Sequence, residues 1–157
     1  RSKLHGHLTE EACFIEEDLK TIMLSEFLPG TSNLEIAIPS LTNMLILKLF
    51  AFSDRYTGQR QEVARAATHA WDIYIIATLA NPADYHQGQK FLSRHADSDI
   101  IKTSQRIIKD NFSDIVAGGW REVLGTEDFY PRLTRQQKEE KLTFAKNRLM
   151  RWFNYSV

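Results

Sequence analysis

The feature that most constrains this chain is a very apolar segment, residues 41–55, that contains a single lysine, Lys48. Its apolar side chains cover nearly every side of a helix, and a helix that is apolar all round is a buried one. An unpaired buried charge is costly, so Lys48 needs a partner. The next expected helix, residues 62–79, has one acid in its apolar half, Asp72. Two interpretations follow: a structural ion pair between Lys48 and Asp72, or a functional site in which Asp72 positions Lys48 or accepts a proton.

Length and composition place the chain in an ordinary globular class. Its 157 residues suit one domain, which we expect to span 1–157, and a hydrophobic content of 43% supports a real core. The formal net charge is zero, so no whole-molecule field attracts nucleic acid or a membrane surface. No apolar run approaches the roughly 20 residues that a membrane-spanning helix needs, and we expect no membrane partner.

Cys13 and the start of the chain bear on location and completeness. One cysteine excludes an internal disulfide and fits a reducing compartment, and we interpret Cys13 as a small buried hydrophobe. The chain does not open with a basic and apolar leader, so we expect a cytoplasmic protein. Because it begins with Arg1 rather than Met, we expect a fragment, a processed product or a trimmed form of a longer chain.

The N-terminal quarter combines a helix pattern with a strand pattern. Apolar residues recur at helical spacing between Thr9 and Phe27, which predicts a helix, with a strand over residues 20–24 as the alternative. The alternating segment 34–38 predicts a short strand that Pro39 ends, and residues 33–40 are therefore expected to form a strand edge. We expect three apolar side chains of this strand to point inward: Leu34, Ile36 and Ile38.

Helical periodicity dominates the rest of the chain and predicts a mostly α protein, a helical bundle with a short N-terminal strand element. Ser40 and Thr134 are expected to cap helices. The amphipathic segment from residue 97 to 116 is expected to end at Gly118-Gly119, followed by a further turn or two. The expected helices cover residues 41–55, 62–79, 83–94, 97–116 and 134–155.

The two central helices carry the candidate site residues. Lys48, Ala51 and Arg55 share one helix face, and two cations on either side of a small residue suit a phosphate or a carboxylate. On the following helix, residues 65, 69 and 72 fall on one side at spacings of four and three. These three residues are Arg65, His69 and Asp72.

A family resemblance rests on three features: a short strand that ends in Pro39-Ser40, the Lys48-Leu-x-Ala-x-x-x-Arg55 segment, and an acid, Asp72, three or four residues past a basic position. This pattern, from Leu34 to Asp114, resembles the C-terminal half of minimal nucleotidyltransferases of the abortive-infection toxin type. The resemblance implies transfer of a nucleoside monophosphate from a nucleoside triphosphate to a protein or RNA acceptor, with Mg²⁺ as cofactor.

The resemblance also assigns roles to residues. It implies that Lys48 faces the triphosphate, that Arg55 orients the site and that Asp72 matches the last acid of the family's second motif. Lys48 and Asp72 are thus the candidate catalytic residues, and Arg55, Arg65 and His69 the candidate substrate-binding residues. The family's metal ligands follow a Gly-Ser loop, which this sequence lacks, so the metal ligands stay unassigned. The chain is then either the helical part of an α+β transferase or a relative without the metal site.

Two alternatives without catalysis stay open. The closing segment is basic and aromatic, which is typical of helices that neutralise phosphates, so we expect a nucleic-acid contact through four of its residues, Arg135, Lys138, Lys141 and Lys146. The opposing interpretation is a helix packed on the core with a solvated basic face. The other alternative is a small helical interaction protein, such as an antitoxin-like partner, whose target the sequence does not specify.

Overall fold

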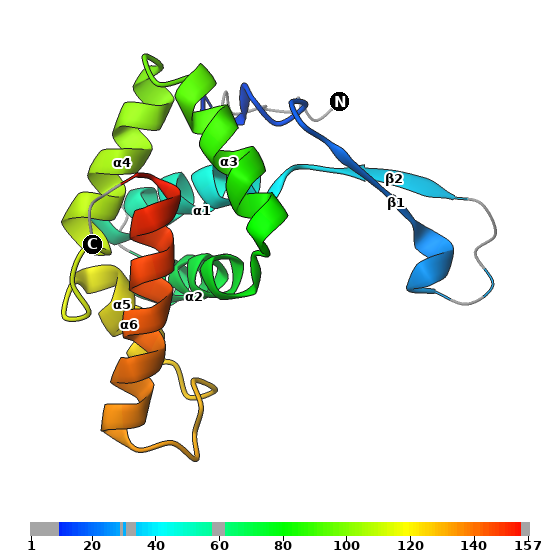
Figure 1. The fold of residues 1–157 in the computed structure, drawn as a ribbon. Helices are drawn as coiled ribbons and strands as arrows, with labels where there is room; N and C mark the ends of the chain where they lie inside the picture. Colours follow the sequence, from blue (N-terminus) through cyan, green and yellow to red (C-terminus); the bar gives the residue numbers. More distant parts are fainter. Residues whose placement is uncertain (1–9, 29, 31–33, 58–61, 155–157) are drawn as a thin grey trace, which may run out of the picture.

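The structure, a computed structural model, describes residues 10–28, 30, 34–57 and 62–154. This part of the chain is mostly α-helical with a short antiparallel hairpin near its N-terminus, which confirms the fold class predicted from sequence (Figure 1). The 3₁₀ turns are η1 (Glu10–Ala12) and η2 (Leu24–Glu26), and the strands are β1 (Lys20–Met23) and β2 (Glu35–Ile38). The helices are α1 (Leu41–Thr57), α2 (Val63–Leu79), α3 (Pro82–Arg94), α4 (Asp99–Asn111), α5 (Gly118–Gly125) and α6 (Arg135–Trp152).

Helix α1 is the centre of the bundle. It packs against α2, α3 and α4, and Leu45, Leu49 and Phe52 are fully buried along it. Ser40 caps the helix as predicted, because its Oγ accepts a hydrogen bond from the Asn43 amide. The apolar side chains on nearly every side of this helix are thus explained by its contacts with three neighbouring helices.

Helix α2 is the second central element, and α5 and α6 pack against it. Thr134 and Gln137 form a capping box at the start of α6, as the sequence signal indicates. One face of α6 is buried in the core against α2, through Leu142, Ala145 and Leu149. The two central helices therefore carry both the core and the candidate site residues.

The hairpin of β1 and β2 extends away from the helices (Figure 1). Lys20 pairs with Ile38 and Met23 with Glu35 in an antiparallel register. The strand predicted over residues 34–38 is confirmed as β2, but its inward apolar face is wrong: Leu34 is 54% exposed and Ile36 38% exposed. The reason is that this end of the hairpin lies beyond the helices that would cover it. Asn33, at the start of the predicted strand edge, lies outside the described residues.

The helix predicted from Thr9 to Phe27 is wrong over its described part. Only the short turn η1 is helical there in the first half, and residues 20–23 form β1, as the strand alternative predicts. Asp18 adopts a left-handed backbone, with φ of 54°, which ends the helical geometry before the strand begins. Pairing with β2 then outweighs the helical spacing of the apolar residues, because spacing is a local signal and the partner strand is not.

The prediction that the fourth helix ends at Gly118-Gly119 is also wrong. Helix α4 ends at Asn111, and the two glycines instead begin α5. A Cβ on Gly119 would lie 2.2 Å from the Phe112 ring, and a Cβ on Gly118 would meet the Tyr56 hydroxyl. The glycines are therefore needed for close approach between elements, and neither has a positive φ of the kind that ends a helix.

Two further features complete the fold. Cys13 is exposed, which contradicts the buried position predicted for it, because the N-terminal segment lies on the surface of the bundle. Across the described residues, none of the helices is both long enough and apolar enough to span a membrane.

Candidate functional site

The structure brings Lys48 of α1 and Asp72 of α2 together on the outer side of the two central helices. Lys48 Nζ lies 2.7 Å from Asp72 Oδ2, so the ion pair predicted from sequence is present. The side chains are 34% and 33% exposed, which places the pair at the edge of the core and not within it. An ammonium group has three N–H donors, so Lys48 can bind Asp72 and still donate to a ligand.

Arg55 and Arg65 approach the same acid, Glu62, from the two ends of the loop between α1 and α2. Arg55 Nη1 lies 3.4 Å from Glu62 Oε1, and Arg65 Nη1 lies 2.9 Å from Glu62 Oε2. Arg55 Nε is also 3.8 Å from the Asp54 carboxylate. Both guanidinium groups are thus balanced by acids that the sequence analysis did not assign to the site.

His69 lies between these two ion-pair clusters. Its Nδ1 is buried and has no hydrogen-bond partner among the described residues. Burial lowers the pKa of His69, and the nearby charges of Lys48 and Arg55 lower it further, while Asp72 acts in the opposite direction. Each cation of this patch lies near an acid, so what His69 adds is a ring nitrogen that can form a hydrogen bond with a ligand.

The five predicted site residues therefore form one continuous patch on α1 and α2. This follows from their spacing: Lys48 and Arg55 are two turns apart on α1, and Arg65, His69 and Asp72 follow one side of α2. Packing of α1 against α2 then aligns the two faces. The roles of the residues in binding or catalysis stay predictions.

The patch offers few possible metal ligands. Lys48 faces one carboxylate, Asp72, whereas a site for transfer from a metal-bound triphosphate needs several. Within residues 10–28, 30, 34–57 and 62–154, no group of three or more His, Cys, Asp or Glu residues could hold a metal ion. The Mg²⁺ implied by the resemblance thus lacks a ligand set in the described part of the chain.

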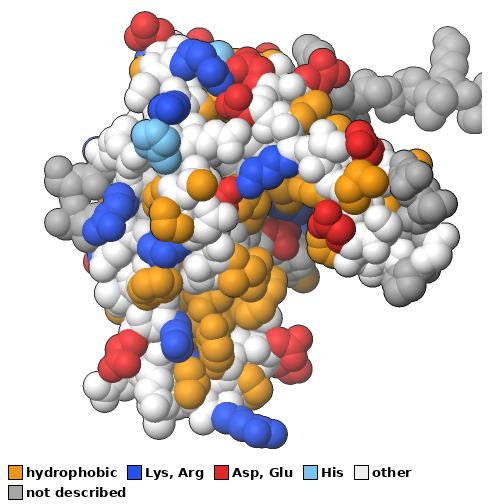
Figure 2. Space-filling model, turned by 45° about the vertical axis from the view of Figure 1, so that its right-hand side comes forward, with side chains coloured by type: hydrophobic (Ala, Val, Ile, Leu, Met, Phe, Trp, Pro, Cys, Tyr) orange, Lys and Arg blue, Asp and Glu red, His pale blue; other side chains and the backbone are white. Residues whose placement is uncertain are grey.

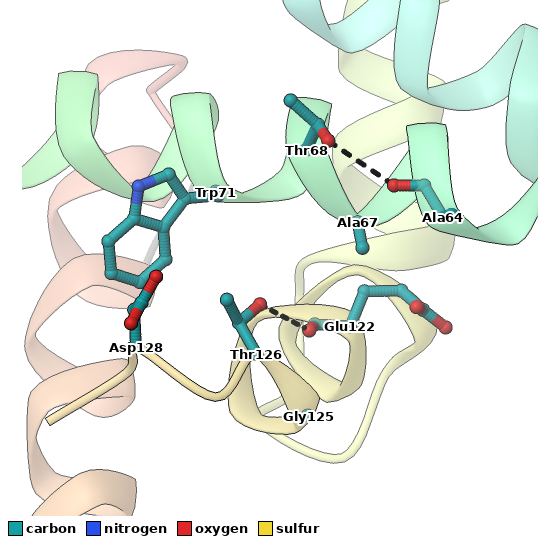
Figure 3. A pocket seen from close by; sticks show the side chains of 8 residues that line it. All are labelled: Ala64, Ala67, Thr68, Trp71, Glu122, Gly125, Thr126 and Asp128. Atoms are coloured by element: carbon teal, nitrogen blue, oxygen red, sulfur yellow. Dashed lines mark hydrogen bonds between the residues drawn. The ribbon is translucent and has the colours of Figure 1, made fainter. Parts of the chain in front are cut away.

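A cavity of about 410 Å³ opens on the adjacent side of α2, and sequence reasoning missed it. Helix α2 contributes small side chains and Trp71, while α5 and the loop after it contribute two acids, Glu122 and Asp128. Figure 3 shows Trp71 and Asp128 together at one end, with Ala64 and Glu122 toward the other. In the sequence, only the small residues Ala64, Ala67 and Thr68, which share one face of α2, indicate that another element could leave a cavity here. The packing of α5 opposite them cannot be read from the sequence.

The four basic residues predicted to contact nucleic acid lie in different surroundings on α6. Arg135 is bound to Glu139 at 2.9 Å, and Lys141 lies over the Tyr130 ring at 5.8 Å. Lys138 is four residues before the buried Leu142 and so lies on the same stripe of the helix, while Lys146 lies four residues beyond Leu142. Lys138 and Lys146 thus lie on the side of α6 that is partly buried. Contact of the four residues with nucleic acid stays a prediction.

Arg148 has a structural role that the sequence analysis missed. Its Nε donates to the Ala77 carbonyl at 2.7 Å, and its Nη2 donates to the Ala80 carbonyl. These carbonyls lie at the C-terminal end of α2, where the last turn leaves acceptors without helical partners. The guanidinium group also lies over the Tyr85 and Phe144 rings, at 5.0 and 5.2 Å.

Comparisons with protein-family models, with curated proteins and with solved structures found no match for this chain. The nucleotidyltransferase resemblance therefore rests on the residues that carry it.

Proposed function

We propose that this chain is a nucleotidyltransferase-like protein, or the helical part of one, that binds the triphosphate of a nucleoside triphosphate on the outer face of α1 and α2. Lys48 donates to the phosphates, Arg55 and Arg65 orient them, and Asp72 positions Lys48. Transfer to a protein or RNA acceptor would require Mg²⁺ held by acids other than Asp72. We place this function in the cytoplasm.

The observation that carries this proposal is the setting of His69. Burial and the charges of Lys48 and Arg55 lower its pKa, Asp72 acts in the opposite direction, and its Nδ1 is unpartnered among the described residues. A triphosphate bound here would add negative charge next to the ring, accept hydrogen bonds from Lys48 and favour a protonated His69.

The first test is calorimetry of the wild-type chain and Lys48→Met with ATP, CTP, GTP and UTP, with and without Mg²⁺ or Mn²⁺. Binding by the wild type and its loss in Lys48→Met are expected. The melting temperature should change little, because a partly exposed ion pair is worth about 1 kcal/mol or less. Lys102→Met, which removes an exposed lysine of α4, is the matched control and should bind like the wild type. A large loss of stability in Lys48→Met, with no binding in the wild type, would instead support the structural ion pair.

The second readout is the titration of His69 followed by NMR. Without ligand the imidazole should titrate below the ordinary histidine value of about 6.5. A bound triphosphate should raise that pKa, because it supplies negative charge next to the ring. A titration that stays unchanged at saturating nucleotide would place the nucleotide elsewhere on the molecule.

A second candidate function, a helical interaction module without catalysis, is favoured by one observation. The hairpin carries exposed apolar side chains, including Phe27 at 64% and Leu34 at 54%. Exposed apolar groups that gather in one place mark a contact site for another molecule. Failure of every nucleotide to bind, with the hairpin required for a partner, would favour this function over transfer.

The nucleic-acid alternative is tested through α6. Lys138→Glu with Lys141→Glu should leave the fold intact, because Lys141 is exposed and Lys138 is partly exposed. If these residues contact phosphates, the double variant should weaken RNA or DNA binding and flatten its steep dependence on salt. Equal salt dependence in the variant and the wild type would remove α6 from consideration as a nucleic-acid contact.

A further inference from the structure

Most of the large apolar side chains that the structure leaves exposed gather in two places. One is the hairpin arm, by which we mean Leu19, β1, η2 and β2 together with Phe27, Leu28 and Leu34. The other is the end of α2 and the facing side of α6, where Leu79 is 75% exposed and Phe144 53% exposed. Figure 2 shows hydrophobic side chains on the body below the arm, next to a hollow between arm and body.

The hairpin arm has an apolar face that the described part of the molecule leaves partly exposed. In the antiparallel register, Ile22 and Ile36 are directly paired and so lie on the same face of the sheet as the Lys20–Ile38 pair. Ile36 is exposed, and Phe27 beyond β1 is more exposed still. An isolated two-stranded hairpin is marginally stable in water, so a covering partner would stabilise this arm.

The body offers a groove of about 320 Å³ between α3 and α6, the α3–α6 groove. Its walls are Pro82, Tyr85, His86, Gln89, Arg148 and Arg151. Tyr85 contributes an aromatic ring to this groove, and the Arg148 guanidinium lies over that ring at 5.0 Å. Two arginines and no acid line this groove, so it suits an apolar group flanked by negative charge.

The arm matches the groove in charge. Glu26 is exposed next to Phe27 at its outer half, while Glu35 is exposed on the face of the sheet opposite Ile36. No ion pair to either acid is formed by the residues described. The single cation of the strands, Lys20, is already bound to Asp84 at 2.5 Å. The outer arm is therefore acidic and apolar, whereas the groove is basic and aromatic.

The arm of one molecule does not reach its own groove. The Lys20–Asp84 contact ties the root of the arm to the start of α3, next to Pro82 and Tyr85, and the outer arm then leads away from the helices (Figure 1). The outer arm and the groove therefore do not meet within one molecule. A second copy related by a two-fold axis can place its arm in this groove while its own groove receives the first arm, and such an exchange is closed.

We propose that two copies of this chain form a dimer by reciprocal exchange of the hairpin arm into the α3–α6 groove. Phe27 and Ile36 pack against Tyr85, Leu79 and Phe144 of the other copy. Glu26 lies near the arginines of the groove, with Arg151 as the exposed partner. This inference does not rest on the nucleotide proposal, which concerns the outer face of α1 and α2.

The test measures the dimer dissociation constant of the full chain by sedimentation. The arm variant Glu26→Lys and the groove variant Arg151→Glu should each raise this constant roughly tenfold or more, because like charges then face each other. Phe27→Ser should do the same. Val116→Ser is the matched control, because Val116 is 68% exposed but lies outside both surfaces, and it should leave the constant unchanged.

The decisive step mixes the arm variant with the groove variant. In that heterodimer each of the two contacts again joins opposite charges, so the mixture should regain the wild-type dissociation constant. Circular dichroism checks that each variant is folded. A wild-type chain that stays monomeric at all concentrations would overturn the proposal and assign the arm to a different polypeptide. Dimers that no variant weakens, or a mixture that stays monomeric, would also overturn it.

Discussion

At the scale of single residues, the cost of the Lys48 charge is smaller than the sequence suggests. The apolar segment around it predicts a buried ammonium group, yet Lys48 and Asp72 are each about one-third exposed. Water therefore screens their attraction, and the pair contributes about 1 kcal/mol or less. The consequence for experiment is that Lys48 can be replaced as a probe of binding without unfolding the protein.

Close approach of backbone to aromatic rings has a larger effect on stability than that ion pair. Gly119→Ala should destabilise the protein by about 1–3 kcal/mol, because the new Cβ would lie 2.2 Å from the Phe112 ring, which is itself packed against Trp120 at 5.1 Å. Denaturant unfolding measures this loss. Gly125→Ala in the same helix is the control: its Cβ meets no atom within 4 Å, so stability should stay equal or rise slightly. Equal losses in both variants would contradict the packing argument.

At the scale of elements, the hairpin is attached to the bundle through a polar contact. Lys20 of β1 donates to the Asp84 carboxylate, which also accepts a hydrogen bond from the Asn81 amide in the capping box of α3. Burial raises the pKa of Asp84, but the hydrogen bonds from Lys20 and the Asn81 amide outweigh burial, so the pKa lies below its ordinary value. One carboxylate thus connects the start of a helix to the root of the arm.

This contact predicts a pH dependence of stability. Because the folded pKa of Asp84 lies below the unfolded value of about 3.9, its stabilisation is present above that pH and is lost as pH falls through the folded pKa. Asp84→Asn should cost about 1–2 kcal/mol at neutral pH and progressively less in acid. Urea unfolding along a pH series measures the difference, with Asp110→Asn, an exposed acid of α4, as the control. A difference between wild type and Asp84→Asn that is constant with pH would show that Asp84 does not contribute through its charge.

At the scale of the whole molecule, stability is distributed unevenly between bundle and arm. The buried apolar side chains form one cluster in the helices, centred on α1 and α2, whereas the strands β1 and β2 contribute no residue to it. Regions with few buried contacts open at low free energy, independently of global unfolding.

Amide hydrogen exchange should report this division. Amides in the middle of α1, such as those of Leu45 and Leu49, should exchange only through global unfolding, and those of β1 and β2 should exchange far sooner through local opening. Protection of the strands should rise with protein concentration if the arm is exchanged between copies, while protection of α1 stays the same. Strand amides as slow as those of α1 in dilute solution would show that the arm is held within one molecule.

The sequence predicts the elements with strong local signals and fails where distant packing decides. Ser40 and Thr134 cap their helices as predicted, because a cap binds backbone amides within the first turn. The helix predicted from Thr9 to Phe27 is wrong because helical spacing is visible locally, whereas the partner strand of β1 is not. The role of Arg148 is equally invisible in the sequence, because its acceptors lie at the end of α2, 68 and 71 residues earlier.

The sequence by itself determined the helical class, the central position of α1 and the shared helix faces of the candidate site, because periodicity and side-chain spacing are properties of the local chain. Only the tertiary structure decided that Gly118 and Gly119 begin a helix, that the hairpin leaves its apolar face uncovered and that Lys48 lies at the rim of the core. These outcomes depend on which surfaces meet, and contacts between residues far apart in sequence set the burial of each side chain.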